Sequence, residues 1–92
     1  MQNRCGITVE RPSENKIRAL NIKRWPIWKK EKSEFNWKYE ERETCYVLEG
    51  EVAVITSEGI VTFGVGDLVT FPKGMECVWQ IKKPVLKHYH FG

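Results

Sequence analysis

From Thr44 to the C-terminus, short runs of strand-forming side chains alternate between two faces with a period of two, and clusters of turn residues separate these runs. A period of two places successive side chains on opposite faces of an extended strand, whereas a helix needs a period near 3.6 residues. The pattern therefore predicts a succession of short strands. The alternating runs are 45–48, 52–55, 60–63, 68–71, 77–81 and 85–91.

Turn residues separate these runs. We expect turns at 57–59, at 64–67 and at 72–74, where glycine, proline, serine and aspartate gather. Asp67 is expected to cap the turn that Gly66 opens. Pro84 follows two lysines and lacks a backbone N–H for a strand ladder, so it predicts a boundary between the last two strands.

The N-terminal third is less regular. Cys5, Ile7 and Val9 alternate, as do the apolar residues of 35–39, and a turn is expected at 12–15. The stretch 25–33 is expected to be a loop or a single helical turn, because Pro26 is incompatible with a regular central strand.

Short strands with evenly spaced turns predict an all-β sandwich or barrel, and no helical period persists for three turns. A closed barrel is favoured because closure removes aggregation-prone edge strands. A chain of 92 residues has room for one core. We therefore predict a single domain over 1–92.

Composition narrows the class of protein. Apolar residues make up 41% of the chain, which is enough for a packed core, and no apolar stretch approaches the length of a membrane span. The first residues lead into no signal-peptide core, so a cytoplasmic location is expected. Cys5, Cys45 and Cys77 are an odd number without a secretory context, which favours free thiols. The net charge of +3 comes from scattered lysines, which does not suggest nucleic-acid binding.

Two segments carry the spacing of a known superfamily. Glu43 lies seven residues before Gly50, and Gly66, Pro72 and Gly74 follow at offsets of six and two. The chain resembles the cupin superfamily, whose first motif has two histidines one residue apart, then a glutamate and a glycine. The second cupin motif reads Gly-x5-Pro-x-Gly-x2-His-x3-Asn. The resemblance implies a small cupin-type jelly-roll β-barrel.

The chain also resembles small single-domain cupins related to the (S)-ureidoglycine aminohydrolase cupin domain. Those proteins carry a Trp-x-x-Trp segment, here Trp25 and Trp28, the run at 43–50, and a Lys-His-Tyr ending, here 87–89. Many of them have no assigned activity. Cupins commonly pair through their sheets or exchange N-terminal strands, so the resemblance implies a homodimer that uses the region of Trp25 and Trp28.

The cupin motifs place Trp37 and Tyr39 where the paired histidines belong, retain Glu43, and place Cys77 where the second-motif histidine belongs. Metal sites need three or four converging N, O or S ligands, usually with imidazole among them. Tryptophan cannot serve, and Tyr39 is a poor ligand unless it is deprotonated. Glu43 and Cys77 alone would bind a soft divalent ion weakly, so we expect neither a metal nor another cofactor here.

Trp37 and Tyr39 are two residues apart and therefore share a face of their strand. If that strand enters the barrel as in cupins, both point inward beside Glu43 and Cys77, with Trp79 behind them. An aromatic wall with one acid and one thiol suits a planar or sugar-like organic ligand. The alternative is that the aromatic residues only fill a small barrel and that Cys77 is a buried small hydrophobe.

Two further groups have alternative interpretations. Burying Glu43 without a partner would cost several kcal/mol, so either the Tyr39 hydroxyl or an arginine pairs with it, or it is held for function. His88 and His90 form a His-x-His pair on one face of the last strand, a ligand geometry if that face is interior. Otherwise they are a partly exposed terminal pair.

Three functions fit these features. The first is a cupin that binds a small organic molecule without a metal. The second is an enzyme of the aminohydrolase or isomerase type, in which Glu43 or Tyr39 moves a proton and Cys77 assists. The third is a structural or regulatory dimer with a filled barrel. The expected partners are a small molecule and a second copy of the chain, with no nucleic acid and no membrane.

Overall fold

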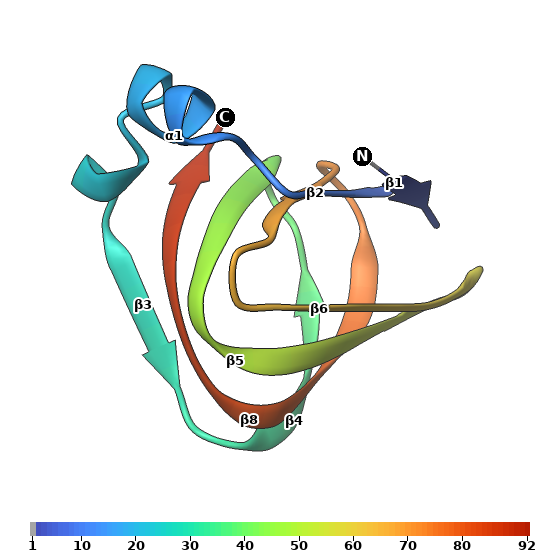
Figure 1. The fold of residues 1–92 in the computed structure, drawn as a ribbon. Coiled ribbons are helices and arrows are strands. Elements are labelled where there is room, and N and C mark those ends of the chain that lie inside the picture. Colours follow the sequence, from blue (N-terminus) through green and yellow to red (C-terminus); the bar gives the residue numbers. More distant parts are fainter. Residues whose placement is uncertain (1) are drawn as a thin grey trace.

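The computed structural model of the protein describes residues 2–92 and consists mainly of antiparallel strands. Figure 1 shows two long strands, β5 and β8, that curve through the whole molecule and form the wall of a barrel. The elements are β1 (Gln2–Arg4), β2 (Ile7–Glu10), α1 (Glu14–Ala19), the 3-10 turn η1 (Ile22–Arg24), β3 (Ile27–Lys30), β4 (Ser33–Lys38), β5 (Glu43–Thr56), β6 (Gly59–Gly64), β7 (Leu68–Phe71) and β8 (Glu76–Phe91).

The two long strands organise the sheet because each changes its outer partner halfway along. The first part of β5 pairs with β7 and the second with β6, while β8 pairs first with β4 and then with β3. β5 and β8 also pair with each other over most of their length. The predicted all-β barrel is thus confirmed. Its hydrogen-bonded path, β1-β2-β7-β5-β8-β3, has two ends, and β4 and β6 each pair with one strand only, so the described strands leave sheet edges at β1, β3, β4 and β6.

The predicted boundary at Pro84 is wrong, because β8 runs through it without a break. Glu49 pairs with Leu86 and Glu51 with Lys83, so Pro84 and Val85 together face the single residue Gly50. This is a β-bulge, which bends a strand and leaves one residue out of the ladder. A proline fits there since no ladder hydrogen bond needs its missing N–H.

The N-terminal third also differs from the prediction. Residues 27–30 form strand β3 rather than a loop or helical turn, and Pro26 is tolerated because it lies just before an edge strand. The turn expected at 12–15 opens helix α1, where the Ser13 side chain accepts a hydrogen bond from the Lys16 N–H. Six residues are too few to show a helical period.

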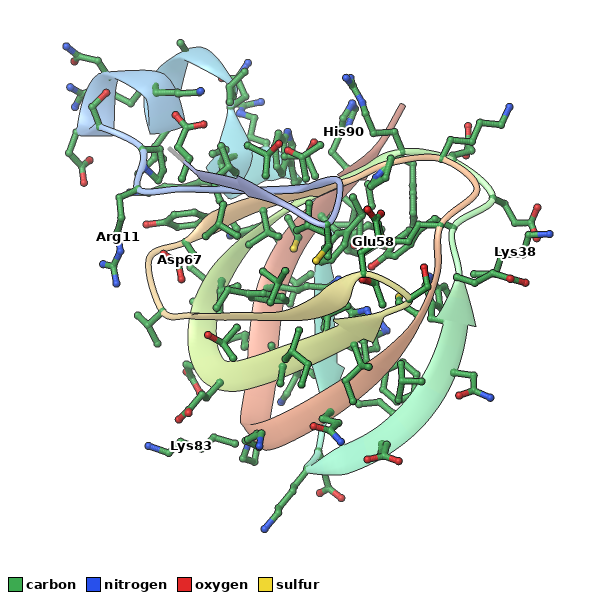
Figure 2. All side chains as sticks on the ribbon, turned by 90° about the vertical axis from the view of Figure 1, so that its right-hand side faces the viewer. Arg11, Lys38, Glu58, Asp67, Lys83 and His90 are labelled. Atoms are coloured by element: carbon green, nitrogen blue, oxygen red, sulfur yellow. The ribbon has the colours of Figure 1, made fainter. Side chains whose placement is uncertain are left out.

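The expected turns at 57–59 and 64–67 are present. Asp67 accepts a hydrogen bond from the Gly64 N–H, at 2.8 Å, and its other oxygen lies 3.1 Å from Arg11 Nε. Figure 2 shows Arg11 and Asp67 together at this turn, with Lys38 and Lys83 directed away from the barrel. Asp67 therefore stabilises the connection between β6 and β7.

The inward faces of the strands form a continuous apolar core, and a smaller cluster lies outside the barrel wall. In the smaller cluster, Ile17 of α1 and Ile22 of η1 pack with Leu68, so the two short helices cover part of the outer surface. The most deeply buried core residues are Ile7, Tyr39, Cys45, Val47, Val52, Val54, Val69 and Phe71.

Within residues 2–92, none of the helices has the length and apolar character required to span a bilayer.

Candidate ligand-binding site

A buried ion pair lies at the centre of the site. Lys87 Nζ donates a hydrogen bond to Glu43 Oε2 at 2.6 Å, and each residue is only 4% exposed. Glu43 opens β5, where the side chains of alternate residues face the interior, and Lys87 belongs to the inward face of β8 that continues through Tyr89. The partner of Glu43 is thus a lysine, and neither the Tyr39 hydroxyl nor an arginine.

Lys87 is also held between two indole rings. Its Nζ lies 4.9 Å from the centre of the Trp28 ring and 4.7 Å from that of Trp79. The negative faces of aromatic rings attract cations, and this attraction grows when the pair is shielded from water. β3 supplies Trp28 directly opposite Lys87 in the sheet register, so the edge strand that the sequence did not predict completes this arrangement.

Tyr39 follows the end of β4 and is fully buried. Its ring stacks on Phe71, with centroids 4.8 Å apart, and its hydroxyl oxygen accepts a hydrogen bond from Trp79 Nε1 at 3.2 Å. Burial, reinforced by the charge of Glu43, raises the pKa of Tyr39 far above its ordinary value. The phenol therefore stays protonated, and its own hydrogen is available to a ligand acceptor.

These groups line a pocket of about 650 Å³, which we call the aromatic pocket. Trp37 lies at its opening, 47% exposed, and its ring is steeply inclined to those of Phe35 and Tyr39, at 86° and 76°. A volume of this size is typical of small-molecule sites. The aromatic pocket is lined by Trp28, Lys29, Lys30, Phe35, Asn36, Trp37, Tyr39, Glu43, Trp79, Lys87, Tyr89 and Phe91.

Of the five ligand-binding residues predicted from the sequence, four line the aromatic pocket: Trp37, Tyr39, Glu43 and Trp79. Cys77 does not line it. Cys77 pairs with Trp37 across β4 and β8 and lines a separate hollow of about 580 Å³ next to Glu76 and Val78. The thiol therefore lies beside the site rather than within it.

The donor set does not fit a metal. Trp37 offers no ligand atom, Tyr39 stays protonated, and the Glu43 carboxylate is already paired with Lys87. Among residues 2–92, no three side chains of the histidine, cysteine, aspartate and glutamate types come together. We therefore derive no metal chemistry at this site.

His88 and His90 lie on the outer face of β8, opposite the face that carries Lys87. His88 Nδ1 is 2.9 Å from the Trp25 carbonyl oxygen, and the His90 ring stacks on the Trp25 indole at 5.3 Å. His88 is buried there and His90 is exposed. The pair therefore helps to attach the segment before β3 to the barrel wall.

The three cysteines are free thiols in different surroundings. Burial raises the pKa of Cys45 to about 12, and burial followed by the charge of Glu43 raises the pKa of Cys77 to about 11. A thiolate is the reactive form of cysteine, so these two groups are poor nucleophiles at neutral pH.

We expect one of the three thiols to react rapidly with Ellman's reagent in the native protein at pH 8, and all three to react in guanidinium chloride. The rapid thiol is Cys5, which is half-buried, whereas Cys45 and Cys77 are covered and protonated. Below a pKa of about 11 the thiolate fraction rises tenfold per pH unit, so slow alkylation of Cys77 should still accelerate between pH 9 and 10. Mass spectrometry identifies which thiols react. Rapid reaction of all three at pH 8 would contradict the assignment of Cys5 as the rapid thiol.

Four residues of the site are not predicted by the sequence, namely Lys87, Trp28, Phe35 and Lys30. A signal for Lys87 was present, because it alternates with Tyr89 and Phe91 on the last strand and so shares with them the face that lines the pocket. The contribution of Trp28 depends on β3 pairing with β8, which the local sequence does not reveal.

Comparison with known proteins supports the fold and the family. The EutQ-like cupin domain family matches residues 18–89. The crystal structure of a DUF861 family protein from Thermotoga maritima is 48% identical, with a TM-score of 0.91, and the match covers 94% of this chain and 99% of that one. No curated protein matches the chain significantly.

More distant structures share the fold. The EutQ protein of Clostridium difficile is 22% identical over 71% of this chain, with a TM-score of 0.66, and the match spans 52% of its own length. A DUF861 family protein of unknown function from Pseudomonas syringae is 24% identical over 72% of this chain, with a TM-score of 0.65, and the match spans 29% of its length. The family match covers most of the chain and the Thermotoga protein is similar almost throughout, so this chain belongs to the EutQ-like cupin (DUF861) family.

Proposed function

We propose that this protein binds a small, planar organic molecule in the aromatic pocket, without a metal. The observation that carries the proposal is an open pocket of about 650 Å³ whose walls are aromatic rings and whose base is the buried Glu43–Lys87 pair. Aromatic rings stack on planar groups, and a few fixed polar atoms orient the ligand. A barrel filled by its own side chains, the structural alternative, would leave no such space.

The polar atoms at the base favour a ligand with both a donor and an acceptor. Glu43 Oε1 accepts no hydrogen bond from a described group. Every side-chain oxygen or nitrogen that is fully enclosed among the described side chains has a hydrogen-bond partner. Oε1 is therefore not fully enclosed, and because Glu43 lines the pocket we assign this oxygen as an acceptor for the ligand. The Tyr39 hydroxyl, which accepts from Trp79, can donate to a ligand oxygen.

Trp37→Ala should weaken binding of any ligand found by a thermal-shift screen about five- to tenfold, since one aromatic contact contributes about 1 kcal/mol. Trp37 is half exposed at the opening, so the melting temperature of the unliganded variant should stay close to that of the wild type. Calorimetric titration measures the affinity. Ile60→Ala is the control, because Ile60 is similarly exposed on β6, away from the pocket. If Trp37→Ala bound the ligand as tightly as the wild type, the ligand would not bind in the aromatic pocket.

A second candidate is an enzyme of the aminohydrolase or isomerase type, by resemblance to the ureidoglycine aminohydrolase cupins. The observation that favours it is a carboxylate oxygen, Glu43 Oε1, and a protonated phenol, Tyr39, that both line the pocket and could exchange protons with a substrate. Cys77 has little part in this version, since its thiol lines a different hollow. A Glu43→Gln variant that retained full turnover of a substrate would rule out the acid-base role.

We also retain the homodimer as a proposal. β3 is an end of the hydrogen-bonded path, and Ile27 on this strand is exposed. An exposed strand edge with an apolar side chain is a surface that a second copy could cover.

A further inference from the structure

The charges around the aromatic pocket do not balance. Three lysines line it, Lys29, Lys30 and Lys87, against a single carboxylate, Glu43. Glu43 is bound to Lys87, whose ammonium is also flanked by two indoles, so the charge of Lys87 is already matched. The unmatched positive charge therefore lies at the mouth of the pocket, on β3.

Lys30 is the lysine best placed to use that charge. Side chains alternate along β3, so Lys30 shares the face of Trp28, which contacts Lys87, and its Nζ lies 5.3 Å from the centre of the Phe35 ring. Lys30 lines the pocket, and no carboxylate among the described side chains forms an ion pair with it. Two residues along a strand span about 7 Å, so the backbone positions of Trp28 and Lys30 are separated by about the length of an indole ring.

We propose that the ligand carries an anionic group, a carboxylate or a group of similar shape and charge, which Lys30 binds while the planar part lies among Trp28, Phe35 and Trp37. This inference rests on the proposed function and assigns the ligand a class, a planar organic monoanion. The opposite end of the ligand then reaches Glu43 Oε1 and the Tyr39 hydroxyl. A cationic ligand would place its charge beside an unmatched lysine, which is unfavourable.

The test compares acids with amides of the same shape. Benzoate and benzamide, and indole-3-carboxylate and indole-3-carboxamide, are titrated against the wild-type protein in low salt, with NMR chemical shifts as the measure of affinity. We expect each acid to bind at least fivefold more tightly than its amide. The preference should shrink at high salt, because exposed charges are screened.

Two variants identify the source of the preference. Lys30→Gln should bring the acid and the amide to similar affinity, whereas Lys32→Gln, which removes a lysine that does not line the aromatic pocket, should leave the preference intact. Amides that bind as well as acids to the wild type would overturn this inference and leave the proposed function standing. Failure of every acid and every amide to bind would overturn both.

Discussion

Gly50→Ala should destabilise the protein by about 4 kcal/mol or more, the range reserved for severe steric strain. A Cβ at this position would lie 2.6 Å from the Pro84 carbonyl oxygen and 2.7 Å from Val85 Cα. Both are backbone atoms of the opposing strand, so neither can rotate away. Gly50 also has a φ of +109°, which residues with a Cβ rarely adopt.

Gly74→Ala is the matched control for this prediction. Gly74 also has a positive φ, +86°, but a Cβ there would meet no atom within 4 Å. Its cost should therefore be the backbone term alone, about 1–2 kcal/mol. Urea unfolding of both variants measures the difference. Equal losses of unfolding free energy in the two variants would show that the close approach of β5 and β8 at the bulge adds no steric cost at Gly50.

The same bulge explains why the sequence predicts the all-β fold but not the length of β5 and β8. Turns at 57–59 and 64–67 follow from residues that favour turns wherever they occur. Gly50 and Pro84 also favour turns, yet each lies inside a strand. They face each other across the β-bulge between β5 and β8, and this pairing lets both strands continue. That pairing joins residues far apart in the chain, so local patterns cannot reveal it.

The site shows the same division. The alternation of Trp37 and Tyr39 predicts that they share a face, and both do line the aromatic pocket. The cupin superfamily is confirmed, while the likeness to ureidoglycine aminohydrolase stays a prediction. Alternation places Lys87 on the same face of the last strand as Tyr89, but lysines are usually solvated, so the local sequence does not identify it as the partner of Glu43. Its burial becomes possible only when Trp28 of β3 and Trp79, from the distant half of the curved strand β8, pack against it.

Lys87→Met should destabilise the protein by about 3–5 kcal/mol at pH 8, the usual cost of leaving a buried charge without its partner. Methionine keeps most of the volume between Trp28 and Trp79, so the loss comes mainly from the Glu43 carboxylate. Denaturant unfolding at pH 8 measures the loss.

Lys83→Met is the control, because Lys83 pairs with Glu51 at 3.6 Å while both side chains are more than half exposed. Surface pairs of this kind contribute about 0–1 kcal/mol, so this variant should unfold almost as the wild type does. A similar loss in both lysine variants would show that burial gives the Glu43–Lys87 pair no special role.

The double variant Glu43→Leu with Lys87→Met separates stability from function. Removing both charges leaves no buried ion without a partner, so the double variant should recover most of the stability that Lys87→Met loses. Its pocket would keep the aromatic walls but lose Glu43 Oε1, the acceptor that we assign to the ligand. A stable double variant that no longer binds would show that the protein keeps this costly pair for its ligand. If the double variant bound as tightly as the wild type, the ion pair would be part of the packing alone.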